Sequence, residues 1–316
     1  MTVPTTLVAT PTQAEPRSRR PRLLGSGPAW RPRNGHLFVL PYVVLLVLFG
    51  AVPVLYSVYL AFTDRDGKFA GLGNFTKAVG DFRFGPAVSH VAVFLAIWLI
   101  ALTVFVVLLA LVVHRVVSRR SRTAIRFAYY VPGALAGASS VMLWLFLLDP
   151  SVSPGSFLVK HVLGAHLFVE SIAPGKLPFI FAMIAFWTGA GGWVVVLYGA
   201  LNTIPQELED AARIDGAGPL TLALRIKLPL IRKWIAYMVI LSFATGTQLF
   251  VEPQLVNQAS LGMVPDTWSS NQLAYQLAFR YADFNAAAAI SVDLLVIGLL
   301  AAVLIISRTG LFKASD

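Results

Sequence analysis

Polar residues recur at helical spacing in an apolar stretch of the C-terminal third of the chain. Ser242, Thr245, Gln248 and Glu252 follow one another at intervals of three, three and four residues, which predicts that they share one face of a helix. Polar groups in hydrocarbon are costly unless they face other helices or a water-filled cavity. The pattern therefore predicts either hydrogen bonds between helices or a lining for a hydroxylated solute. Asp293, an acid in the middle of the last apolar stretch, predicts a polar pair or a place in the same pathway.

The residue types of most catalytic and metal sites are missing or scattered. The 316 residues include no cysteine, and the five histidines show no HExxH spacing. The phosphate loop GxxxxGKS or GxxxxGKT is also missing, so the chain itself is not expected to bind ATP. We therefore expect no cofactor, no metal site and no catalytic residues.

Three tryptophans are candidates for a different kind of contact. Trp187 and Trp193 lie among glycines and offer flat faces to a sugar ring, although packing or interface anchoring is the commoner role. Trp268 lies in the last predicted external loop, where it could contact a docked protein.

The elements that must position these residues are membrane-spanning helices. Hydrophobic residues make up 57% of the chain and charged residues 13%, with a mean hydropathy of +0.73. A soluble domain carries about 25% charged residues, so this chain is predicted to lie in a membrane. Six apolar blocks approach or exceed the roughly 20 residues that cross a bilayer as a helix. These blocks are Leu37–Phe62, Ala87–Val113, Phe127–Leu148, Pro178–Leu201, Trp234–Val251 and Phe284–Ile306.

The distribution of positive charge orients this bundle. With six spans, the basic tail 1–36, the loops 114–126 and 201–233, and the end 307–316 lie on one side, and they hold 18 of the 25 Lys and Arg residues. The positive-inside rule places that side in the cytoplasm, together with both termini. The net charge of +10 is thus explained by topology, and no nucleic-acid partner is expected.

The cytoplasmic loop 201–233 reads as a helix, a turn and a second helix. Thr203 and Gln206 have the spacing of a capping box, with Pro205 in the first turn. Gly216 and Gly218 end this helix, and a second short helix is expected from Pro219 to Leu228–Pro229. The apolar stripe of the first helix comprises Ile204, Leu208, Ala211 and Ala212. From periodicity alone, the loop could equally be an interfacial hairpin resting on lipid.

The residue pattern of this loop resembles the EAA loop of binding-protein-dependent ABC importer permeases. Asp210-Ala211-Ala212 is followed after three residues by Gly216, and after nine more by Ile226-Lys227-Leu228-Pro229. The family pattern is E-A-A, three residues, G, nine residues and I-x-L-P. Asp210 replaces the leading glutamate, which shortens the carboxylate arm and keeps its charge.

Further segments are similar to carbohydrate-uptake permeases of the maltose type. These segments are LPYVVLLVLFGAVPVLYSVYLAFTD (40–64), GLGNF (71–75), YVPGALAGASSVMLWLFLLDP (130–150) and AFRYADFNAAAAISV (278–292). The resemblance implies a six-helix type I ABC importer permease domain over 37–306, between a disordered tail (1–36) and a short cytoplasmic end (307–316). It also implies a bacterial inner membrane location.

The resemblance implies a division of labour between subunits. The loop would dock as a coupling helix on a cytoplasmic ABC ATPase dimer, which would bind the ATP. The residues implied in coupling are Asp210, Ala211, Ala212, Arg213, Asp215, Gly216, Leu228 and Pro229. The other expected partners are a second EAA-type permease, an extracytoplasmic binding protein, membrane lipid and a sugar.

Three alternatives stay open at the level of sequence. The same architecture could carry an amino acid, a peptide or phosphate. A stand-alone secondary transporter would be expected to show repeated halves and more charge within the membrane. A membrane-embedded enzyme would need a nucleophile–base pair or a metal constellation, and neither is apparent.

Overall fold

The computed structural model describes residues 35–115, 118–135 and 137–309. Almost all of the predicted tail 1–36 lies outside the described residues, as does most of 307–316. The chain divides into two compact units, residues 1–51 and 52–316. In the first unit, α1 (Gly35–Leu46) leads into the π-helical η1 (Val47–Ala51), and the side chains from Leu37 to Phe49 are all exposed.

The second unit is helical throughout its described length, with one isolated antiparallel bridge between Thr63 and Phe69. Its elements, in chain order, are α2 (Val52–Phe62), α3 (Gly73–Val79), α4 (Phe84–Ala101), the π-helical η2 (Leu102–Val106), α5 (Val107–Arg115), α6 (Arg119–Ala134), α7 (Ala138–Leu148), α8 (Ser156–Val162), α9 (Phe168–Ser171), the 3-10 helix η3 (Pro174–Lys176), α10 (Leu177–Leu201), α11 (Gln206–Ile214), α12 (Pro219–Thr221), the π-helical η4 (Leu222–Lys227), α13 (Leu228–Gly246), α14 (Val251–Ala259), α15 (Ser270–Phe279) and α16 (Phe284–Thr309).

Among the described residues, five continuous helices are long and apolar enough to cross a membrane. They are Leu37–Phe62, Phe84–Arg115, Pro174–Leu201, Pro219–Gly246 and Phe284–Arg308. Each overlaps a predicted block, so the all-helical membrane fold is confirmed. The predicted number of six is reached only if the bent pair in the third block counts as one span.

The third block is broken into two helices. Thr123–Ala134 and Ala138–Leu148 meet at an angle of 99°. Pro132 lies in the last turn of α6, where it cannot donate a backbone hydrogen bond, and Gly137 has a φ of +69° at the start of α7. These two residues account for a bend that a count of apolar residues does not reveal.

The fifth span begins and ends earlier than predicted. It runs from Pro219 to Gly246, rather than from Trp234 to Val251. The expected second short helix is therefore not separate, because α12, η4 and α13 continue directly into the span. Pro229 is accommodated because it lies in the first turn of α13, after the widened π-helical turns of η4.

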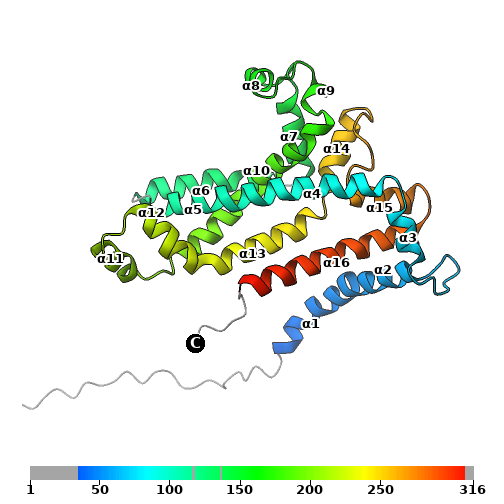
Figure 1. Ribbon diagram of the computed structural model, residues 1–316, viewed down its shortest axis with the longest axis horizontal. Coiled ribbons are helices and arrows are strands. Elements are labelled where there is room, and N and C mark those ends of the chain that lie inside the picture. Colours follow the sequence, from blue (N-terminus) through cyan, green and yellow to red (C-terminus); the bar gives the residue numbers. More distant parts are fainter. Residues whose placement is uncertain (1–34, 116–117, 136, 310–316) are drawn as a thin grey trace, which may run out of the picture. The chain divides into compact units, whose positions relative to one another are not determined.

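Helix α10 is the centre of the packed bundle and contacts α4, α5, α6 and α13. Its approach to α6 depends on Gly191, where a Cβ atom would lie 1.9 Å from the carbonyl oxygen of Tyr129. Only a residue without a side chain permits this contact, as is common between membrane helices. Within this unit, α11 lies at one end of the bundle and α3 and α15 at the other (Figure 1).

Candidate functional site

The candidate coupling element is the short helix α11 and the tight turn that follows it. Gly216 adopts a φ of +83°, in the left-handed region that favours glycine. The N–H of Ala217 donates to the carbonyl of Ala212 at 2.9 Å, and the N–H of Gly216 donates to that of Arg213 at 3.0 Å. This pair of bonds is a Schellman motif, which satisfies the free carbonyls at the helix end. The chain then re-enters a helix at Pro219.

The start of α11 differs from the predicted capping box. The hydroxyl of Thr203 donates to the carbonyl of Ala200 at 2.8 Å instead of capping α11. Pro205 is the N-cap residue, and no side chain caps the helix there. The prediction was wrong because the preceding carbonyls of α10 also need donors and lie closer to Thr203.

Most of the predicted coupling residues face outward. Asp210, Ala211, Arg213, Asp215 and Gly216 are exposed. Ala212 and Leu228 are partly buried, and Pro229 is exposed at the start of α13. The guanidinium of Arg213 donates to Asp210 at 3.1 Å, so two charged residues pair with each other on the exposed rim of α11. Ile214, 87% exposed, adds an apolar side chain to this surface.

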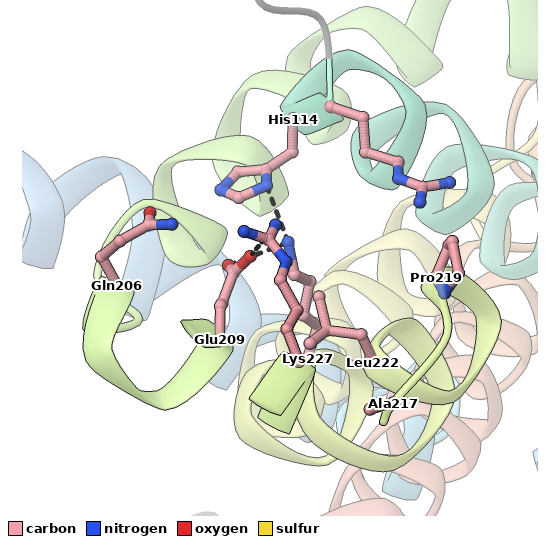
Figure 2. Close-up of a pocket in the computed structure, with 9 residues that line it drawn as sticks. His114, Gln206, Glu209, Ala217, Pro219, Leu222 and Lys227 are labelled. Atoms are coloured by element: carbon pink, nitrogen blue, oxygen red, sulfur yellow. Dashed lines mark hydrogen bonds and ion pairs between the residues drawn. The ribbon is translucent and has the colours of Figure 1, made fainter. Parts of the chain in front are cut away.

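The opposite side of α11 is held by a buried cluster of charged and polar groups. Glu209 and Lys227 retain only 4% and 5% of their exposure, and the Lys227 Nζ lies 2.9 Å from the Glu209 Oε1. The same ammonium contacts the Nδ1 of His114, at the end of α5, at 3.1 Å. Figure 2 shows Glu209 and His114 both directed toward Lys227. The guanidinium of Arg213 lies 3.6 Å from the second oxygen of Glu209.

We call Glu209, Lys227 and His114 the charged junction. It joins three elements, α11, η4 and α5, at one point. Two charges removed from water need close mutual contact to be tolerated, and this geometry supplies it. The sequence analysis did not predict the junction, because each residue had a local explanation. Glu209 is an acid near a helix N-terminus, and Lys227 occupies the variable position of I-x-L-P. A usable signal was a lysine between Ile226 and Leu228 in an otherwise apolar helical turn.

The four residues predicted to form a polar stripe on the fifth span differ in burial and do not all lie on that span. Ser242 is buried, and its hydroxyl has no hydrogen-bond partner among the described residues. Thr245 is exposed and donates to the carbonyls of Leu241 and Ser242, each at 3.1 Å. Because α13 ends at Gly246, Glu252 lies on α14, so the four residues do not share one helix face. Burial raises the pKa of the Glu252 carboxyl.

A cavity of about 620 Å³ opens among α2, α13, α15 and α16. Gln248 is the one predicted pathway residue among its lining, while Asp293 lies partly buried on α16 outside it. The remaining polar lining comprises Ser57, Thr247, Asn271 and Ser291. Apolar side chains complete the wall, so the cavity combines hydrogen-bonding groups with an apolar surface.

The three tryptophans are packed rather than presented to a ligand. Trp268 is buried, stacks on His90 at 4.8 Å between ring centroids and meets Phe181 edge-on at 4.8 Å. The suggestion that Trp268 contacts an external protein was therefore wrong. Trp187 packs edge-on against Trp144 at 5.7 Å, and Trp193 packs against Tyr237 at 5.9 Å.

Comparison with known proteins finds relatives that cover 84–92% of the chain. No protein-family model matches it. The chain is 28% identical over 291 residues to the alpha-glucoside transport system permease protein AglF of Rhizobium meliloti, covering 89% of this chain and 82% of that protein. It is 27% identical over 328 residues to the diacetylchitobiose uptake system permease protein NgcF of Streptomyces coelicolor, covering 92% and 89%. It is 26% identical over 284 residues to the sn-glycerol-3-phosphate transport system permease protein UgpA of Salmonella typhimurium, covering 84% and 89%.

The fold is shared with a solved transporter. A chain of a bacterial ABC transporter that imports the acidic polysaccharide alginate matches with a TM-score of 0.72 at 20% identity, covering 88% of this chain and 95% of that one. The chain is a multi-pass helical membrane protein of the bacterial inner membrane. The chain is a permease subunit of an ABC importer.

Proposed function

We propose that this permease forms half of a translocation pathway for a sugar or a sugar-derived solute. All three relatives above are named as permeases for glycosides or for glycerol phosphate, and the fold neighbour imports a polysaccharide. The observation that carries the proposal is α11, which combines an exposed rim with a buried anchor at one end of the bundle. Such a helix is suited to receive a push from another subunit and pass it inward.

The coupling role is assigned to the two faces of α11 separately. The exposed rim of Asp210, Ala211, Arg213 and Asp215 would contact a cytoplasmic ATPase, which supplies the ATP hydrolysis. Charged rims fix the register of such contacts more than they add affinity. The charged junction would then transmit the displacement of α11 to the spans Phe84–Arg115 and Pro219–Gly246.

The solute pathway is assigned to the cavity that Gln248 lines. Sugars carry many hydroxyl groups, which need donors and acceptors when they leave water. The side-chain amides of Gln248 and Asn271 supply both, and Ser57 and Ser291 add hydroxyls. Ser242, Thr245, Glu252 and Asp293 would affect transport through helix packing, since they do not line this cavity.

The proposed topology follows from the charge distribution, and the proposed partner proteins follow from the class of transporter. Both termini and α11 would lie in the cytoplasm, with 37–306 as the membrane domain. A second EAA-type permease would supply the other half of the pathway. An extracytoplasmic binding protein would deliver the solute, in line with the alginate importer, which has been solved with its pentasaccharide-bound periplasmic protein.

The test is uptake by the reconstituted complex of both permeases and the ATPase, screened over monosaccharides, oligosaccharides, glycerol phosphate, amino acids and peptides. We expect ATP-dependent uptake of a sugar or sugar derivative, stimulated by the binding protein. Uptake that is insensitive to ATP would refute the proposal, and uptake of an amino acid or peptide alone would refute the solute class.

Two matched glycine variants test the coupling role of the loop. Gly216→Pro breaks the left-handed turn after α11, and Gly262→Pro breaks an equivalent turn after α14, where φ is +85°. We expect permease variants with Gly216→Pro or Ala212→Trp to insert into the membrane normally. Complexes that contain either variant should hydrolyse ATP without transporting solute. Gly262→Pro should retain the ratio of solute transported to ATP hydrolysed. Unchanged transport by Gly216→Pro would show that the turn has no coupling role.

A further inference from the structure

Two adjoining cavities beside α11 differ sharply in their chemistry. The first, of about 440 Å³, is lined by Arg115, Arg213 and Lys227 and by a single carboxylate, that of Glu209. Three basic side chains against one carboxylate give this cavity an excess of basic groups. It lies among the end of α5, the helix α11 and the start of the fifth span (Figure 2).

The second cavity, of about 300 Å³, is apolar. Leu108 and Val112 of α5 form one wall, and Leu220 and Leu224 of the fifth span form the other. Leu108 and Val112 are 53% and 50% exposed on a helix that is long and apolar enough to cross a membrane, so the groove is open on the outer surface of this span. The two cavities share Arg115, Pro219, Leu222 and Lys227 in their linings and therefore lie side by side.

Arg115 occupies the boundary between the two cavities. None of the ion pairs formed among the described residues involves it, whereas Lys227 and Arg213 both contact Glu209. Leu108 lies seven residues before Arg115, which is about 10 Å along a helix. The site thus has a cation at the end of a candidate membrane span and an apolar groove that extends about 10 Å from it along the span.

We propose that this composite cavity binds an anionic phospholipid of the cytoplasmic leaflet. The phosphate group would lie beside Arg115, and an acyl chain would follow the groove past Val112 and Leu108. Basic pockets between membrane helices on the cytoplasmic side are suited to anionic headgroups. The bound lipid would contact α5, α11 and the fifth span at once, so it would stabilise the arrangement around the charged junction. This inference takes its orientation from the proposed function.

Native mass spectrometry of the complete importer complex tests the proposal, with phosphatidylglycerol and phosphatidylcholine as probes. We expect phosphatidylglycerol to be retained in preference to phosphatidylcholine. Arg115→Gln should reduce the retained phosphatidylglycerol about five-fold, and Arg115→Lys should largely preserve it. The matched control is Arg225→Gln, an exposed arginine of η4 that lines neither cavity and should have no effect. An equal loss in the control, or equal retention of both lipids, would overturn the proposal.

The apolar half and the identity of the ligand need separate variants. Val112→Trp fills the groove without changing charge and should displace phosphatidylglycerol. If millimolar inorganic phosphate displaces the lipid as effectively as added phosphatidylglycerol does, the site binds a free anion and the lipid assignment fails.

A photocrosslinker at Val112→Cys is unambiguous because the chain has no cysteine. It should react with lipid, and reaction with a protein subunit would overturn the proposal. These binding measurements require no transport. A complex that binds phosphatidylglycerol but shows no ATP-driven uptake would therefore refute only the proposed function.

Discussion

The two ends of the second unit are held together by different chemistry. At the α11 end, the buried charges of Glu209 and Lys227 join a short helix to the fifth span. At the opposite end, two asparagine side-chain amides connect α3 and α16 to the end of α2. The Nδ2 of Asn74, on α3, donates to the carbonyls of Thr63 at 2.7 Å and Ala61 at 3.0 Å, and that of Asn285, on α16, donates to the carbonyls of Thr63 at 2.8 Å and Leu60 at 3.0 Å.

The two ends differ in how strongly their stability depends on each partner of a contact. The amides satisfy free carbonyls at the end of α2, and their hydrogen bonds are neutral. An ion pair in a low-dielectric site is far more sensitive to the loss of one partner, because the other charge stays buried. The α11 end therefore depends on both members of a buried charge pair, whereas the opposite end depends on neutral hydrogen bonds.

Lys227→Met should have the largest effect on stability. Removing the ammonium leaves the buried Glu209 carboxylate with only the more distant guanidinium of Arg213, at 3.6 Å, as a partner, which costs about 3 kcal/mol. The free energy of unfolding, measured in detergent micelles, should fall by this amount. The double variant Lys227→Met with Glu209→Leu should regain most of the loss. If the single and double variants are equally destabilised, packing rather than charge holds this end.

Asn285→Leu should have the next largest effect, at the opposite end. It leaves the Leu60 carbonyl without this donor and weakens the capping of Thr63, which costs about 1–3 kcal/mol. We expect the loss to be insensitive to salt and to pH between 5 and 8. A strong dependence on either would contradict the neutral character of this clamp.

Lys77→Met tests the ion pair that lies beside the amide clamp. Burial alone would raise the pKa of Asp283, but the bond from Lys77 holds that pKa below its usual range. The Lys77 side chain is 62% exposed, so its removal should cost no more than about 1 kcal/mol at pH 7.

The pH dependence of this variant has a definite sign. A carboxyl whose pKa is lowered on folding contributes stability above its ordinary pKa of 3.8, and this contribution is lost as the pH falls through the folded value. The difference between wild type and Lys77→Met should therefore vanish in strong acid. A difference that grows on acidification would argue against the pair.

Arg280→Gln should have the smallest effect. Arg280 and Asp266 form a pair at 3.1 Å, and both side chains are exposed. Exposed pairs contribute about 0.5 kcal/mol or less once screening and side-chain entropy are included. Thermal unfolding of this variant should match wild type within error. A loss comparable to that of Lys227→Met would remove the distinction between buried and exposed charge.

Much of the fold was readable from the sequence, because crossing a membrane constrains every residue of a span. Apolar blocks and helix lengths predicted the position of every span, but the fifth span begins 15 residues before its predicted start and the third block is broken into two helices. The position of α11 and its turn at Gly216 was also predictable, since few residues other than glycine adopt a φ of +83°. The segments 71–75 and 278–292 signalled the class, but their role emerged only from the structure, where Asn74 and Asn285 converge on α2.

The sequence by itself determined the membrane class, the helical elements and the place of the loop. Tertiary structure alone decided which polar residues meet. Glu209 is 18 residues from Lys227, and His114 is 113 residues from it, so no local periodicity relates them. The break after Gly246 that removes Glu252 from the fifth span is equally non-local, since Gly246 packs where a Cβ atom would meet Leu95 and Trp98. Helical periodicity predicts a face, but only packing decides what that face touches.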